Sequence, residues 1–118
     1  MRKILPILIG VMVLFAVQPA KALTGETYIE TCKALTEESG SNIQRHLQDY
    51  SGCIAYTSAI RDTVDLYESI FGICINKNIT HLQLVTVAVR NIKNFPEKWH
   101  YNPVHLIIPA WQKAWPCK

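Results

Sequence analysis

Apolar side chains recur at intervals of three and four residues along most of the chain that follows residue 22. This spacing places side chains on one face of an α-helix. The pattern is longest at 52–73, which is predicted to form one central helix. Its main stripe comprises Cys53, Tyr56, Ile60, Val64, Tyr67, Phe71 and Cys74. A second apolar line lies beside it, at Ala55, Ala59, Leu66, Ile70 and Ile73. We therefore expect this helix at the centre of a bundle or partly covered by another protein.

Shorter helices are predicted on both sides of this segment. A first helix is expected at 25–38, followed by a turn at 39–42 and a short helix at 43–50. The last helix is expected to begin at Asn102-Pro103, because Asn favours the cap and Pro the first helical position. Pro109 lies inside this helix, where proline removes a hydrogen bond, so a kink is expected there.

Another helix is predicted from Thr80 onward. Thr80 and Gln83 match a capping box, in which each side chain bonds to the backbone N–H of the other residue. Pro96 marks the end of this helix. Its inward side chains are expected to be Leu82, Val85, Val89 and Ile92. The loop that follows, 94–102, is polar and aromatic, and its rings either stay exposed for binding or fold back onto the core.

Four cysteines restrict how these helices can be joined. Cys53 and Cys74 lie 21 residues apart, and a straight helix between them would be about 32 Å long. A disulfide needs Cα atoms within about 7 Å, so these two cannot pair unless the helix breaks. Two pairings remain: Cys32–Cys53 with Cys74–Cys117, or Cys32–Cys74 with Cys53–Cys117. The first closes shorter loops and is favoured. The predicted fold is all-α, a small disulfide-stapled bundle of about four to six helices.

The first 22 residues have the pattern of a secretory signal peptide. Met1-Arg2-Lys3 is followed by an apolar run at 4–17 and by Ala20-Lys21-Ala22, which matches the usual cleavage site. The apolar run is shorter than the ~20 residues that span a bilayer, which disfavours the alternative of an uncleaved anchor. We expect cleavage after Ala22 and a single domain at 23–118, in an oxidising compartment where paired cysteines are common.

Charge is balanced over residues 23–118 but unevenly distributed. This part holds nine basic and nine acidic residues, which argues against nucleic acid as a partner and against stable membrane association after cleavage. Residues 23–75 hold eight acids and three bases, whereas 76–118 hold one acid and six bases. Such a separation can steer a charged partner, unless the two halves interleave in space and cancel.

No catalytic or metal-binding constellation is predicted. Four paired cysteines would leave no thiolate to act as a nucleophile. The four histidines, His46, His81, His100 and His105, lack the spacing of a metal site. Asp62 and Asp65 share a helix face, but nothing in the sequence predicts a pocket around them. We therefore expect no enzyme activity and no cofactor, and the best remaining function is binding to another protein.

Several short motifs occur in a fixed order over residues 50–118. They are Cys53-Ile-Ala-Tyr56, Ile73-Cys74, Ile79-Thr80-His-Leu82-Gln-Leu84, Phe95-Pro96-Glu97, Ala110-Trp111 and Ala114-Trp115-Pro116-Cys117. This order resembles the Tai/Rap family of type VI secretion amidase immunity proteins. The Cys-x-x-Tyr start and the Pro-Cys end are its most specific parts. The chain departs from the family at Ala59, where a glycine is common, and at Pro109.

The resemblance implies a small periplasmic helical protein without catalysis of its own. Such proteins bind a secreted, papain-like peptidoglycan amidase and block its active-site groove. They typically form homodimers, and two inhibitors bind two effectors. These departures do not change the predicted fold. They leave open which toxin is bound, because recognition between such inhibitors and toxins is local.

Candidate contact residues follow from the exposed positions of the predicted elements. An effector-binding surface is predicted at Asp62, Asp65 and Glu68, together with the loop residues Lys98, Trp99, His100 and Tyr101. The second apolar line is predicted to supply a dimer interface at Ala59, Leu66 and Ile70. An alternative function is that of a periplasmic helical chaperone or binding protein of the acid-stress kind, which would expose apolar surface at low pH.

Overall fold

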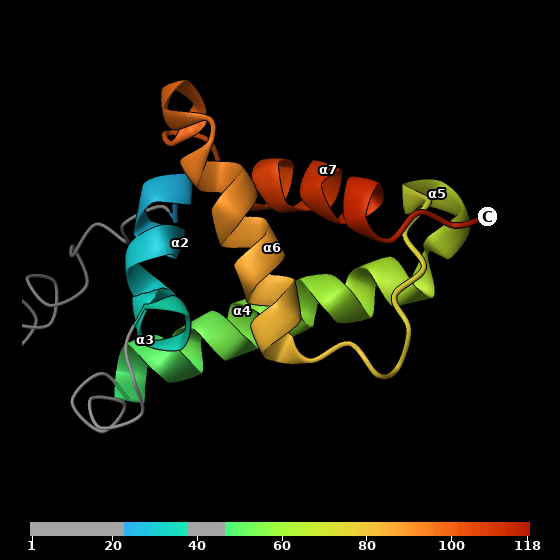
Figure 1. The fold of residues 1–118 in the computed structure, drawn as a ribbon, viewed down its shortest axis with the longest axis horizontal. Coiled ribbons are helices and arrows are strands. Elements are labelled where there is room, and N and C mark those ends of the chain that lie inside the picture. The colour runs from blue at the N-terminus through green and yellow to red at the C-terminus, as the bar shows by residue number, and fades with distance from the viewer. Residues whose placement is uncertain (1–22, 38–46) are drawn as a thin grey trace, which may run out of the picture.

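A computed structural model describes residues 23–37 and 47–118 (Figure 1). Its elements are α2 (Gly25–Thr31), α3 (Lys33–Thr36), α4 (Leu47–Leu66), α5 (Glu68–Phe71), α6 (His81–Lys93), the 3-10 helix η2 (Pro96–Lys98) and α7 (Val104–Ala114). The described ranges contain no strand, only an isolated bridge between Ile73 and Pro116. The predicted all-α class is confirmed. The predicted signal peptide, the turn at 39–42 and the start of the short helix at 43 lie outside the described residues.

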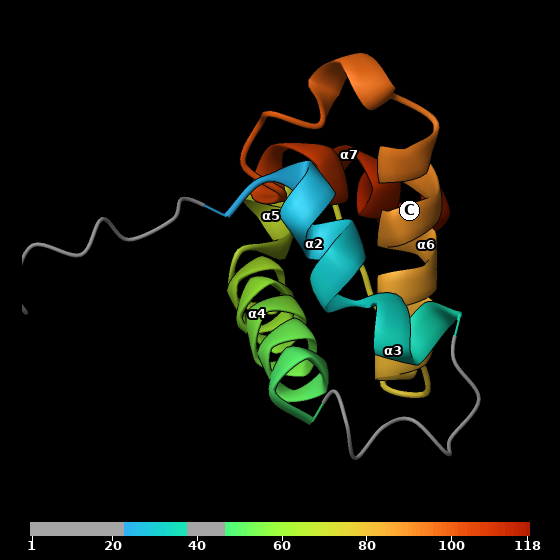
Figure 2. The same ribbon diagram turned by 90° about the vertical axis from the view of Figure 1, so that its left-hand side faces the viewer.

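Helix α6 is the centre of the bundle, packed against α2, α3, α4 and α7. It passes in front of α4 in Figure 1, with α7 extending from beside its upper part, and α2 lies between α4 and α6 in Figure 2. Thr80 and Gln83 form the predicted capping box at its start. Its buried residues are Leu84, Val85, Ala88, Val89 and Ile92. The prediction that Leu82 faces inward is wrong: it is 50% exposed, because Leu84 and Ala88 complete the buried face instead.

The predicted single helix at 52–73 is wrong at both ends. Helix α4 begins earlier, at Leu47, and ends at Leu66; Tyr67, with φ −125° and ψ 43°, separates it from α5. Tyr67 is exposed rather than buried. Gly72 then takes a left-handed conformation with φ 65°, and its N–H donates to the Glu68 carbonyl at 2.8 Å. Glycine adopts this conformation at little cost, so Cys74 lies in an extended segment and not on the helix.

The favoured disulfide pairing is confirmed. Cys32 bonds to Cys53 and Cys74 to Cys117. The first bridge is fully buried and joins α4 to the junction at Cys32 where the predicted helix at 25–38 divides into α2 and α3. The second lies beside the Ile73–Pro116 bridge and joins the C-terminal residues to the segment after α5. The loop-closure estimate gives about 3 and about 4 kcal/mol for the two bridges.

Helix α7 is fixed to α6 by apolar packing and by two side-chain hydrogen bonds. The indole N–H of the fully buried Trp111 donates to the Leu84 carbonyl at 3.1 Å. The Asn91 amide donates to the Leu106 carbonyl at 3.0 Å. Helix α7 begins at Val104, whose N–H donates to the Asn102 side chain at 3.1 Å. Its start therefore lies one residue after the predicted first helical position, Pro103.

The loop between α6 and α7 is attached to the start of α2. The Gly25 N–H donates to the Tyr101 carbonyl at 2.9 Å, and the Glu26 N–H donates to the Trp99 carbonyl at 3.2 Å. The indole N–H of Trp99 donates to the Ile92 carbonyl at 2.7 Å. These three bonds fix the loop above the bundle at the α2 end (Figure 1). In the described part of the chain, no helix is long and apolar enough to cross a membrane.

Replacing Tyr28 by Phe is expected to destabilise the protein in a pH-dependent way. The Tyr28 hydroxyl hydrogen-bonds to the buried Thr57 hydroxyl at 2.8 Å, and Phe would leave Thr57 without this partner, at a cost of about 1–3 kcal/mol at neutral pH. Burial raises the pKa of Tyr28 from 10.0 to about 12. The raised pKa contributes stability that is fully present below pH 10 and is lost as pH rises towards 12.

The difference in unfolding free energy between the wild type and Tyr28→Phe should therefore shrink between pH 10 and 12. Urea unfolding across this pH range measures it. Tyr56→Phe is the control, because its hydroxyl bond to Asn102 is exposed, and it should cost less at neutral pH. Equal costs for the two variants would contradict a buried bond at Tyr28.

Replacing Gly25 by Ala is expected to destabilise the protein by about 1–3 kcal/mol, because it overpacks a filled site. The new Cβ would lie 2.7 Å from Leu106 Cδ1 and 3.3 Å from the Trp99 carbonyl oxygen. Gly52→Ala is the matched control. Its Cβ would meet only Thr31 Cγ2, at 3.7 Å, so improved helix propensity should stabilise α4 by about 0.5–1 kcal/mol. Thermal unfolding that moves both variants in the same direction would contradict this packing.

Candidate functional site

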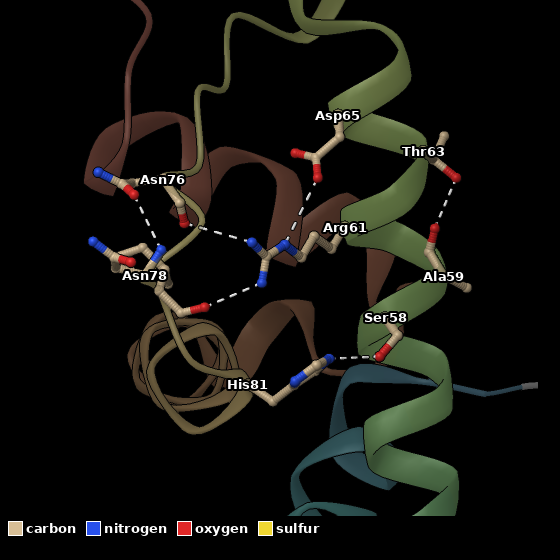
Figure 3. A network of polar contacts seen from close by, with 9 residues as sticks. Ser58, Ala59, Arg61, Thr63, Asp65, Asn76, Asn78 and His81 are labelled. Carbon is tan, nitrogen blue, oxygen red and sulfur yellow. Dashed lines mark hydrogen bonds and ion pairs between the residues drawn. The ribbon is translucent and has the colours of Figure 1, made fainter.

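The predicted acidic contact residues lie on α4 and α5, and one of them has a structural partner. Asp65 Oδ2 lies 3.7 Å from Arg61 Nε. Arg61 also donates to the backbone carbonyls of Ile79, at 3.1 Å, and Asn76, at 3.5 Å (Figure 3). Arg61 thus joins α4 to the segment that leads into α6. Asp62 and Glu68 are exposed, so the predicted acidic surface consists of two exposed carboxylates beside one ion-paired carboxylate.

The Ser58–His81 pair is the contact closest to a catalytic arrangement. Ser58 Oγ lies 2.7 Å from His81 Nε2 and joins α4 to the first residue of α6 (Figure 3). A hydrolytic triad needs a third group that orients the histidine, and no other side chain of the described ranges is hydrogen-bonded to His81. Over these same residues, no group of three or more potential metal ligands occurs. The pair therefore has the geometry of a contact between two helices.

The predicted loop residues divide into exposed side chains and an anchor. Lys98, His100 and Tyr101 are exposed. The His100 and Tyr101 rings pack edge to face, with their centroids 4.4 Å apart. Trp99 is half-buried against the core, and its indole N–H is bonded to Ile92. Trp99 thus anchors the loop to the core, by apolar packing and by this hydrogen bond.

We call Asp62, Asp65 and Glu68 the acidic row. The structure does not bring the acidic row and the loop at 94–102 together. The loop lies at the α2 end of the molecule, whereas α5 lies at the opposite end (Figure 1). A partner that contacts one protomer at both places would have to extend along most of the bundle.

A cleft of about 650 Å³ opens between the loop and α7. We call it the basic cleft. Two lysines, a histidine, a tyrosine and an asparagine supply its polar groups, and three apolar side chains complete its walls. The lining residues are Asn91, Phe95, Lys98, Tyr101, His105, Leu106, Pro109 and Lys113. This size and mixture of groups are typical of a binding site for a small molecule or a peptide segment.

The basic cleft carries two lysines that are paired with no carboxylate of the described residues. Neither Lys98 nor Lys113 forms an ion pair with any described residue, and no carboxylate lines the cleft. The Lys98 ammonium lies over the Phe95 ring, 5.1 Å from its centroid. Lys93, at the end of α6, is bonded instead to Glu37 at 2.6 Å, and this contact lowers the pKa of the Glu37 carboxyl.

Lys98 and Tyr101, on the loop side of the cleft, are among the contact residues predicted from the sequence. His105 and Lys113 on α7 and Asn91 on α6 are not. The excess of basic residues over 76–118 was the signal that pointed towards them. It could not show which lysines share one cleft, because that depends on how α7 crosses α6.

The predicted dimer residues lie on an exposed apolar face of α4 and α5. Leu66 is 78% and Ile70 73% exposed, so neither belongs to the core of the protomer. Ala59 lines a shallow groove of about 200 Å³ between α4 and α7. The other residues of this groove are Tyr56, Ile60, Thr63, Val64, Phe71, Val104 and Ile108. Exposed apolar surface of this kind is typical of a protein interface.

Comparison with protein families gives a match over most of the chain. The model of a family described as Rap1a immunity proteins matches residues 24–117, which include both disulfides and every residue of the basic cleft. No curated protein and no solved structure matches the chain significantly. Because the family model covers most of the sequence, the chain belongs to the Rap1a immunity protein family.

Proposed function

We propose that this protein binds a secreted peptidoglycan amidase and blocks its active site, protecting the cell that makes both. It acts in the periplasm after a signal peptide is removed behind Ala22, and residues 23–118 form its one immunity-type domain. Membership of an immunity protein family supports the role, and favours it over an acid-stress chaperone. The two disulfides support an oxidising compartment.

The observation that carries the proposal is the rigid loop at the α2 end of the bundle. An inhibitor that occludes a cleft binds best when the inserted segment is already ordered, because little conformational entropy is then lost. Three hydrogen bonds, from Gly25, Glu26 and Trp99, fix this loop. It presents Lys98, His100 and Tyr101 to solvent, and exposed aromatic side chains often dominate protein interfaces.

The acidic row on α4 and α5 supplies the second contact area of the proposal. Asp62, Asp65 and Glu68 lie far from the loop within one protomer (Figure 1). In a complex of two inhibitors with two effectors, each effector could contact the loop of one protomer and the acidic row of its partner.

Inhibition of the amidase tests the proposed function directly. Purified protein, expressed from the full reading frame, is mixed with the amidase encoded beside it, and peptidoglycan cleavage is measured. We expect cleavage to stop at one inhibitor per enzyme, with a stable complex on a sizing column. Tyr101→Ala should weaken inhibition about tenfold or more, whereas Leu82→Ala, at a similarly exposed residue of α6, should not. Full cleavage at excess wild-type protein would refute the proposed pair.

Homodimer formation through the α4–α5 face is tested by Leu66→Asp. Leu66 is largely exposed, so the variant should stay folded but become a monomer, because a carboxylate cannot be buried unpaired in an apolar interface. Leu82→Asp, which alters an exposed leucine on α6, is the control and should remain a dimer. Light scattering gives the mass and circular dichroism the fold. A Leu66→Asp protein that still dimerises would place the interface elsewhere.

A further inference from the structure

We infer that the basic cleft is a binding site for a carboxylate-bearing peptide segment, and that the amidase effector supplies this segment. The inference rests on the proposed function and assigns a partner chemistry to a cleft that shares Lys98 and Tyr101 with the predicted contact residues. Its α7 side, formed by His105, Pro109 and Lys113, takes part in no other contact described above.

Charge is the first reason. Lys98 and Lys113 line the cleft from the loop and from α7, and neither has an acidic partner among the described residues. Two unneutralised ammonium groups beside one concave surface create a positive potential that favours an anionic ligand. Glu37 is bonded to Lys93. Glu97, next to Lys98 in sequence, and Glu26, whose N–H bonds to Trp99, do not line the cleft.

The chemical character of the walls selects a carboxylate on a peptide. Tyr101 and Asn91 can donate hydrogen bonds from neutral groups, and Phe95, Leu106 and Pro109 offer apolar surface beside them. A peptide segment that combines acidic and apolar side chains matches this mixture better than a nucleic acid or a free phosphate does.

Position identifies the effector as the source of the segment. Lys98 and Tyr101 belong both to the exposed loop and to the cleft. A protein that covers the loop therefore also covers the mouth of the cleft. The cleft is large enough for several side chains, so an acidic surface loop of the effector can enter it.

A short peptide tests the site without the effector. The probe is a capped peptide with two glutamates around a leucine, and its control has glutamines instead. Titration into the 15N-labelled protein should shift the backbone amides of Phe95, Lys98, Tyr101 and His105 with the glutamate peptide only. Added salt should weaken the effect, because it screens exposed charges. No shift, or equal shifts with both peptides, would overturn the assignment of the site.

Charge-reversal variants test the source of the segment. The double variant Lys98→Glu/Lys113→Glu should lose the peptide shifts and bind the amidase about tenfold or more weakly in titration calorimetry. Lys77→Glu, an exposed lysine before α6 and outside the cleft, is the matched control and should change neither. Circular dichroism checks that all variants fold.

The two proposals fail in different ways. If the wild type binds the amidase and the double variant binds it equally well, the effector is not the occupant, although the proposed function stands. If neither protein binds the amidase while the peptide still shifts the cleft amides, the proposed pair fails and the carboxylate site stands. Peptide binding that persists in the double variant would overturn the site itself.

Discussion

The burial of α6 on several sides is the interaction on which the rest of the structure depends. Leu84, Val85, Ala88 and Ile92 bring α2, α3, α4 and α7 against one helix of thirteen residues. Trp111 also packs in this core, and its indole N–H donates a hydrogen bond to the Leu84 carbonyl. Helices α2, α3, α4 and α7 all pack against α6, so the position of α6 sets the loop and α7, and with them the basic cleft.

The two disulfides support this small core in different places. Cys32–Cys53 lies inside it and joins the N-terminal helices to α4, whereas Cys74–Cys117 lies nearer the surface and joins the chain end to the segment after α5. A domain of this size buries limited apolar area, and covalent links that restrict the unfolded chain compensate for it. The helices therefore stay in place although α4 and α5 leave Leu66 and Ile70 exposed.

The charge separation of the sequence is kept only in part in the fold. Asp62, Asp65 and Glu68 lie on α4 and α5, whereas Lys98 and Lys113 line the cleft. Glu26 and Glu30 lie on α2, next to the loop, and Glu37 is paired with Lys93. The cleft, which shares Lys98 and Tyr101 with the loop, thus differs in chemistry from the acidic row. A partner that recognises both of them is selected by charge as well as by shape.

The sequence by itself determined the features that depend on neighbouring residues or on simple geometry. The Thr80–Gln83 capping box and the helical class follow from spacing along the chain. Tertiary structure decided the break at Tyr67, the exposure of Leu82, the anchoring of Trp99 and the meeting of Lys98 with Lys113. These depend on how each helix is rotated about its axis, and contacts with helices distant in sequence fix that rotation.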